Sequence, residues 1–155
     1  MSHAIWLHDL VNPKDLKIVC STIAKQVKAD RKNFGIDAII VTGVSGNVIG
    51  GAISFLTGIP LIIVRKDEKN HSGYEIEYAD SLDRLENLRY IIIDDLIDTG
   101  STIKRIQEKI DRKFNDNKLM KIYLYNQSSS AAECAMQEGL DRVYPYFQME
   151  TTKED

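Results

Sequence analysis

The chain has 155 residues, a length that fits one compact domain and is short for two. Hydrophobic residues make up 43% and charged residues 28%, which is typical of globular proteins and excludes the disordered and fibrous classes. The 20 Lys and Arg against 23 Asp and Glu give a formal net charge of -3. This balance gives no general basic field, so we expect no nucleic-acid partner.

The chain shows no targeting or membrane signal. No stretch approaches the ~18 apolar residues of a membrane span, and the N-terminus lacks the charged and apolar regions of a signal peptide. Cys20 and Cys134 lie far apart among apolar neighbours, which predicts buried free thiols in a reducing compartment. We therefore expect a cytoplasmic protein with no membrane partner.

The apolar pattern predicts strands that alternate with helices. Asn12 and Pro13 suit the start of a helix, and apolar side chains at helical spacing continue it to residue 29. Short runs of consecutive apolar residues predict strands that are buried on both faces. These strands are expected at 38–41, 60–64, 90–93 and 120–125, with further helices at 48–56, after residue 100 and at 130–139.

Two weaker patterns complete the expected fold. Residues 74–78 alternate as an exposed hairpin strand would, after a polar loop at 65–73, and 142–144 fits an edge strand. The whole predicts an α/β protein with an open, mostly parallel sheet and helices on both faces, in a single domain over residues 1–155. In such a sheet, ligands bind beyond the carboxyl ends of the strands.

The segment after the strand at 90–93 carries the most specific signal. Asp94 and Asp95 are adjacent carboxylates, whose repulsion a metal, water or a polyol would relieve, and vicinal hydroxyls suit them. The stretch 99–102 then opens a helix, where Gly100 allows close backbone approach and the free N–H groups suit a phosphate. A site for vicinal hydroxyls and a site for a phosphate that lie this close together in the sequence match the span of a ribose 5-phosphate.

Residues 90–103 resemble the phosphoribosyl pyrophosphate (PRPP) signature of the type I phosphoribosyltransferases. The resemblance implies the fold of that family, with Asp94 and Asp95 holding the ribose hydroxyls directly or through magnesium, and binding that metal either themselves or through water. Asp98 stands where the 6-oxopurine enzymes of the family carry an aspartate that handles a purine ring proton, which slightly favours a purine substrate. The resemblance also implies that the 5-phosphate is wrapped by Asp98, Thr99, Gly100, Ser101 and Thr102.

The turn at 41–47 leads through glycines into a helix N-terminus, which suits an anion. In the family this place is the pyrophosphate loop, which often contains a non-proline cis peptide. By similarity, Val44, Ser45 and Gly46 would contact PRPP, and the Val44–Ser45 bond is the candidate cis peptide. Many relatives carry a basic residue where Ser45 stands, so either pyrophosphate is held less tightly here or another loop compensates.

The polar loop at 65–73 carries cations that could compensate for the missing basic residue at position 45. Arg65, Lys66, Lys69 and His71 resemble the Arg-Lys-x-x-Lys-x-His pattern in the mobile catalytic loop of orotate phosphoribosyltransferase. There these side chains close over pyrophosphate and often reach the site of the partner subunit, which implies a homodimer. Cations on a closing loop stabilise the charge of the leaving group. With Asp98, these four residues form the expected catalytic set.

The resemblance implies an enzyme that transfers ribose 5-phosphate from PRPP to a nucleobase, with magnesium as cofactor and pyrophosphate as product. The base-binding residues stay unassigned, although a small hood from the N- and C-terminal segments is expected. An orotate-type pyrimidine enzyme is an alternative, but Asn126 stands where that enzyme carries an arginine. A non-catalytic regulator that senses PRPP or a nucleotide is another, although such proteins usually add a nucleic-acid-binding module or a basic face.

Overall fold

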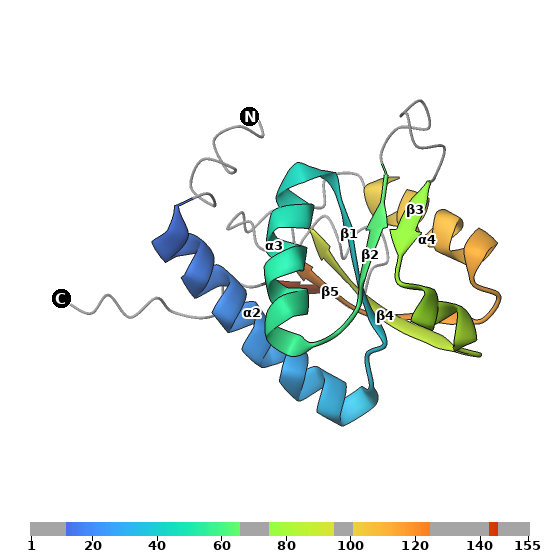
Figure 1. The fold of residues 1–155 in the computed structure, drawn as a ribbon, viewed down its shortest axis with the longest axis horizontal. Helices are drawn as coiled ribbons and strands as arrows, with labels where there is room; N and C mark the ends of the chain where they lie inside the picture. The colour runs from blue at the N-terminus through green and yellow to red at the C-terminus, as the bar shows by residue number, and fades with distance from the viewer. Residues whose placement is uncertain (1–11, 66–74, 95–100, 125–142, 146–155) are drawn as a thin grey trace.

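The computed structural model describes residues 12–65, 75–94, 101–124 and 143–145 (Figure 1). Among these residues, no helix has both the length and the apolarity that crossing a membrane requires. The elements, in chain order, are α2 (Pro13–Phe34), β1 (Ala38–Thr42), α3 (Gly43–Thr57), β2 (Leu61–Val64), β3 (Ile76–Tyr78), the 3-10 helix η1 (Asp80–Arg84), β4 (Leu88–Asp94), α4 (Ser101–Lys113), β5 (Asn117–Leu124) and β6 (Val143–Pro145).

The strands form one sheet in the order β3-β2-β1-β4-β5-β6. β1 pairs in parallel with β2 and β4, and the parallel pairing continues through β5 to β6. β3 is antiparallel to β2 and forms one edge, so the alternating segment predicted as a hairpin strand is confirmed. The predicted α/β fold with a mostly parallel sheet is confirmed as well.

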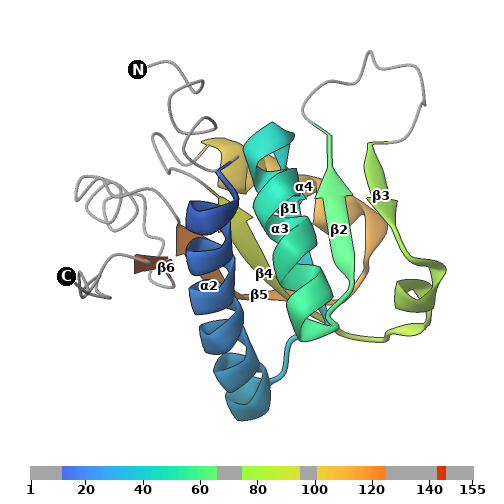
Figure 2. The ribbon, with the colours of Figure 1, turned by 60° about the vertical axis from the view of Figure 1, so that its left-hand side comes forward.

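Both faces of the sheet are covered, as the continuous apolar runs predicted. α2 and α3 lie side by side on one face, and α4 lies on the other (Figures 1 and 2). Successive residues of each central strand point to opposite faces. Ile40 and Ile92 therefore pack with α4, whereas Ile39 and Ile91 pack with α2 and α3.

Helix α2 begins as predicted but extends beyond residue 29. The side chain of Asn12 accepts a hydrogen bond from the N–H of Lys14 at 3.0 Å, with Pro13 in the first position. The sequence of the last turns is polar, yet Asp30 is only 5% exposed. Its carboxylate pairs with Lys121 at 2.8 Å and accepts a hydrogen bond from the Tyr123 hydroxyl. The turns of α2 beyond residue 29 thus pack against the sheet through the ion pair of Asp30 with Lys121, which a pattern of apolar residues does not reveal.

Cys20 is buried on α2, as predicted. Burial raises the pKa of its thiol to about 11, which suits a packing role and disfavours the reactive thiolate. Cys134 and the helix predicted at 130–139 lie outside the described residues.

Candidate functional site

The predicted site lies where the parallel strands end. Thr42 of β1 is in register with Val64 of β2, and Asp94 of β4 is in register with Leu124 of β5. Because these strands run in the same direction, their carboxyl ends share one edge of the sheet. α3 starts directly after Thr42, and α4 starts at Ser101, seven residues after β4 ends. The N-termini of both helices therefore lie at this edge.

Asp94 is the last residue of β4 and is 6% exposed. A carboxylate at the end of a central strand suits the hydroxyl-binding role predicted for it, because it can accept hydrogen bonds from a diol. Ser101 and Thr102 form the first turn of α4, where the structure leaves Ser101 exposed and Thr102 half-buried. The first turn of a helix has free N–H groups and the positive end of the helix dipole, so it attracts a phosphate.

The second anion-binding position predicted from the sequence also lies on a helix. α3 begins at Gly43, five residues before the start predicted at Val48, so Val44, Ser45 and Gly46 form its first turn and not a separate loop. The described residues contain no cis peptide bond, and the Val44–Ser45 candidate is therefore wrong in this structure. The left-handed φ of Gly43, 73°, makes the sharp turn from β1 into the helix.

Close packing holds this helix against the sheet. A Cβ added to Gly46 would lie 3.5 Å from Val41 Cβ, and one added to Gly50 would lie only 2.3 Å from Val41 Cγ1. Glycine at position 50 therefore lets α3 approach β1 closely. Val44 is 67% exposed, and its backbone N–H belongs to the first turn of α3, where N–H groups have no partner within the helix.

Arg65 follows β2 and belongs to the base of the predicted cationic loop. Its N–H donates to the carbonyl of Glu75 at 2.9 Å, and its Nη2 donates to Glu77 Oε1 at 2.5 Å. Its Nε is buried and has no hydrogen-bond partner among the described residues. Arg65 is thus held at the base of a hairpin by Glu77, with one donor still unused.

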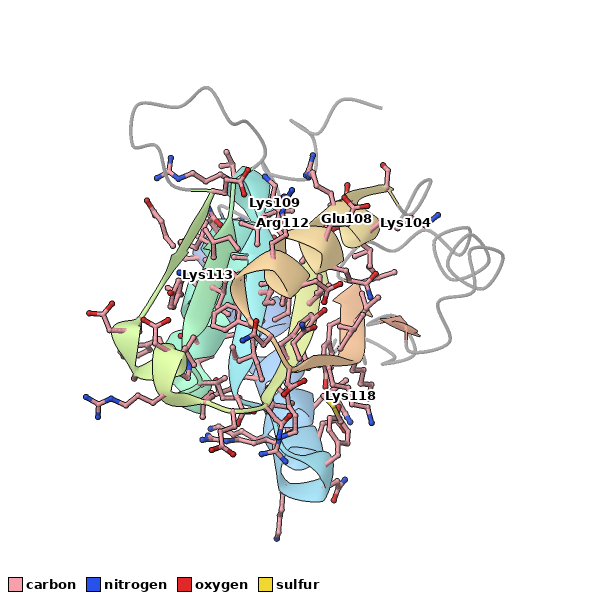
Figure 3. The ribbon with its side chains drawn as sticks, turned by 90° about the vertical axis from the view of Figure 1, so that its right-hand side faces the viewer. Lys104, Glu108, Lys109, Arg112, Lys113 and Lys118 are labelled. Atoms are coloured by element: carbon pink, nitrogen blue, oxygen red, sulfur yellow. The ribbon has the colours of Figure 1, made fainter. Side chains whose placement is uncertain are left out.

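Two residues at this edge were not singled out in the sequence. Lys109 of α4 is 4% exposed, and its Nζ donates to the carbonyl oxygen of Arg65 at 3.0 Å (Figure 3 labels Lys109). Thr42 is also 4% exposed, and its buried hydroxyl has no partner within the described part of the chain. A buried polar group without a partner is costly, and its position at the N-terminus of α3 suits a bound anion. No local pattern distinguishes either residue from surface lysines and strand threonines.

The remaining predicted site residues lie outside the described residues. Where the chain is described, no group of three His, Cys, Asp or Glu side chains is placed to hold a metal ion. Asp94 nevertheless offers the oxygen ligand that Mg²⁺ accepts when substrate phosphates supply the others. The undescribed predicted residues are Lys66, Lys69, His71, Asp95, Asp98, Thr99 and Gly100.

No family model matches the chain, but individual relatives do. It is 37% identical over 94 residues to a hypoxanthine/guanine phosphoribosyltransferase of Methanocorpusculum labreanum, covering 55% of this chain and 49% of that protein. It is 33% identical over 121 residues to an adenine phosphoribosyltransferase of Campylobacter curvus, covering 70% and 66%. The chain spans about half to two thirds of the length of such relatives.

The fold comparison agrees. Adenine phosphoribosyltransferase from Saccharomyces cerevisiae superimposes with a TM-score of 0.68 at 17% identity, covering 89% of this chain and 82% of that one. The chain therefore shares the fold of a solved phosphoribosyltransferase. The chain is a homologue of the type I phosphoribosyltransferases and has the fold of that family.

Proposed function

We propose that the protein transfers ribose 5-phosphate from PRPP to a nucleobase, with release of pyrophosphate. The observation that carries the proposal is the arrangement of the sheet edge, where the buried carboxylate of Asp94 lies with the N-termini of α3 and α4. A carboxylate suits ribose hydroxyls, and two helix N-termini suit the two anionic ends of PRPP.

In the proposed reaction the anomeric carbon becomes cationic as its bond to pyrophosphate loosens. The first turn of α4 binds the 5-phosphate and Asp94 orients the ribose, so the sugar is fixed in one geometry. The N–H groups of the first turn of α3, around Ser45, receive the pyrophosphate. Magnesium, when bound, would neutralise part of the pyrophosphate charge, and Asp94 and Asp95 are the residues proposed to hold it, directly or through water.

The rest of the proposed machinery comes from the resemblance. Arg65, Lys66, Lys69 and His71 would stabilise the charge that develops on pyrophosphate, and Asp98 would accept a proton from the base. The unused Nε of Arg65 is compatible with such a role. We also propose that the protein is a cytoplasmic homodimer.

A purine is the proposed acceptor. Asp98 favours this class, and the two relatives described above are named as hypoxanthine/guanine and adenine enzymes. Because the chain spans only part of each relative, the base it accepts must be determined directly.

The test is pyrophosphate release from PRPP and magnesium with adenine, hypoxanthine, guanine, xanthine, uracil or orotate. We expect release with at least one purine and none without a base. Release with orotate alone would instead identify the pyrimidine enzyme. PRPP binding without release for any base would identify the non-catalytic regulator.

A further inference from the structure

Helix α4 carries several cations on the side that faces the hairpin of β2 and β3. The Nζ of Lys109 donates to the carbonyl of Arg65 at 3.0 Å, and the Nη2 of Arg112 lies 3.7 Å from Glu75 Oε2 (Figure 3 labels both side chains of α4). Arg105 precedes Lys109 by four residues, about one helical turn, so it belongs to the same side of the helix. Lys109 and Arg112 are thus both engaged with the hairpin.

Arg105 differs from these neighbours. Its Nε and Nη2 are both buried, and neither atom has a hydrogen-bond partner among the residues that the structure describes. An arginine keeps its charge at any pH at which proteins stay folded. A buried charge is costly when no counter-charge accompanies it. Within the described ranges, the chain therefore buries part of a cation without supplying the anion that would balance it.

The two buried donors of Arg105 specify the kind of ligand. Nε and Nη2 lie along one edge of the planar guanidinium, and their N–H bonds form a fixed fork. Such a fork binds two oxygens of one carboxylate or phosphate group through parallel hydrogen bonds. A water molecule would bring no negative charge to balance the cation. The unpartnered edge of Arg105 is therefore suited to an oxyanion.

The position of Arg105 places this oxyanion at the carboxyl edge of the sheet. Arg105 lies one turn after Ser101, where α4 begins at that edge. Lys109, one turn further on, is tied to the carbonyl of Arg65, the residue that directly follows β2. Arg105 therefore lies on the side of α4 that faces the end of β2, and not on the helix axis, where the first-turn N–H groups point. A phosphate beside the helix and one at its N-terminus would occupy different positions.

The other helix at this edge lacks a cation. The first turn of α3, which is proposed to receive pyrophosphate, carries no charged side chain, so its N–H groups alone would balance a group with several negative charges. We propose that the Nε and Nη2 of Arg105 bind the pyrophosphate group of PRPP and supply the positive charge that α3 lacks. This inference rests on the proposed function, because it names a further residue of the same site.

The experiment measures binding without turnover. Isothermal titration calorimetry with magnesium compares inorganic pyrophosphate and ribose 5-phosphate as ligands of the wild-type chain, Arg105→Met and Arg105→Lys. Arg112→Met is the matched control, because it removes a guanidinium that is 63% exposed from the same side of the same helix. Since a bidentate charged pair is lost, we expect Arg105→Met to weaken pyrophosphate binding by at least ~10-fold and ribose 5-phosphate binding by less than ~3-fold. Arg105→Lys keeps the charge but not the fork, so it is expected to weaken pyrophosphate binding as well.

Thermal unfolding separates ligand binding by Arg105 from a structural role. Because the guanidinium has no partner in the described part of the chain, ligand-free Arg105→Met is expected to melt no lower than Arg112→Met. Arg105→Met is also expected to lose most of the rise in melting temperature that pyrophosphate gives the wild type. An arginine that only stabilises the fold would instead lower the melting temperature of the ligand-free protein when it is replaced.

The outcomes distinguish this inference from the proposed function. A wild-type chain that binds neither pyrophosphate nor ribose 5-phosphate would overturn both. A wild-type chain that binds pyrophosphate no more tightly than Arg105→Met would overturn the role of Arg105 alone, and so would a loss confined to ribose 5-phosphate. Ligand-free Arg105→Met that melts clearly below Arg112→Met would overturn it too, because the arginine would then act on the fold.

Discussion

Replacing Lys109 with Met tests how the base of the 65–75 hairpin is held. The two side chains have similar lengths, so Lys109→Met keeps the packing of the methylene groups and removes the ammonium. The lost contact is the hydrogen bond from Nζ to the Arg65 carbonyl, 3.0 Å long, in a residue that is 4% exposed. A hydrogen bond to a charged group contributes roughly 1.5–3 kcal/mol, and relief from burying the charge offsets part of this.

We therefore expect Lys109→Met to lower the free energy of unfolding by about 1–2 kcal/mol. At this chain length that corresponds to a fall of roughly 2–8 °C in melting temperature. The assay is urea and thermal unfolding, with Lys118→Met as the control, because Lys118 is an exposed lysine on β5 (Figure 3). If the free energy of unfolding of Lys109→Met lies within ~0.5 kcal/mol of that of the control, the ammonium does not hold the hairpin base.

Two further predictions concern α3 and α2. Gly50→Ala is expected to be less stable than Gly51→Ala by about 1–3 kcal/mol in urea unfolding, since helix propensity cancels and only the clash with β1 remains. Equal stabilities of the two variants would contradict the packing described. Cys20 is expected to alkylate ~100-fold more slowly than a free thiol at pH 8, read by mass spectrometry in a Cys134→Ser background, since its pKa is raised from 9.0 to about 11. Alkylation of Cys20 at the rate of a free thiol would contradict its burial. Between about pH 9 and 11 the folded state keeps the Cys20 thiol proton that the unfolded state has lost, so the free energy of unfolding should fall as the pH rises through this range.

The sequence was most informative where one local pattern decides the structure. Strands buried on both faces need continuous apolar runs, and those runs located β1, β2, β4 and β5 to within a few residues. The edge strand β3 is half-exposed, and its alternation was equally readable. The carboxyl edge of the sheet, with Asp94 on it, followed from the parallel strands that such patterns favour.

The sequence was least informative where distant groups decide the structure. The start of α3 reads as a glycine-rich loop, because no local signal shows that Gly46 and Gly50 lie against β1. The end of α2 depends on Asp30, whose partner Lys121 is 91 residues away. Lys109 likewise looks like a surface lysine until the Arg65 carbonyl, 44 residues away, is placed beside it.

The edge of the sheet formed by β4, α3 and α4 is proposed to bind PRPP for transfer to a base. The most direct measurement is base-dependent pyrophosphate release by the wild-type chain and by Asp94→Asn, which keeps the side-chain size but removes the charge. We expect release with a purine for the wild type and a loss of at least ~100-fold in kcat/KM for Asp94→Asn, about 2.7 kcal/mol. Equal turnover by the two proteins, or no release with any base, would contradict it.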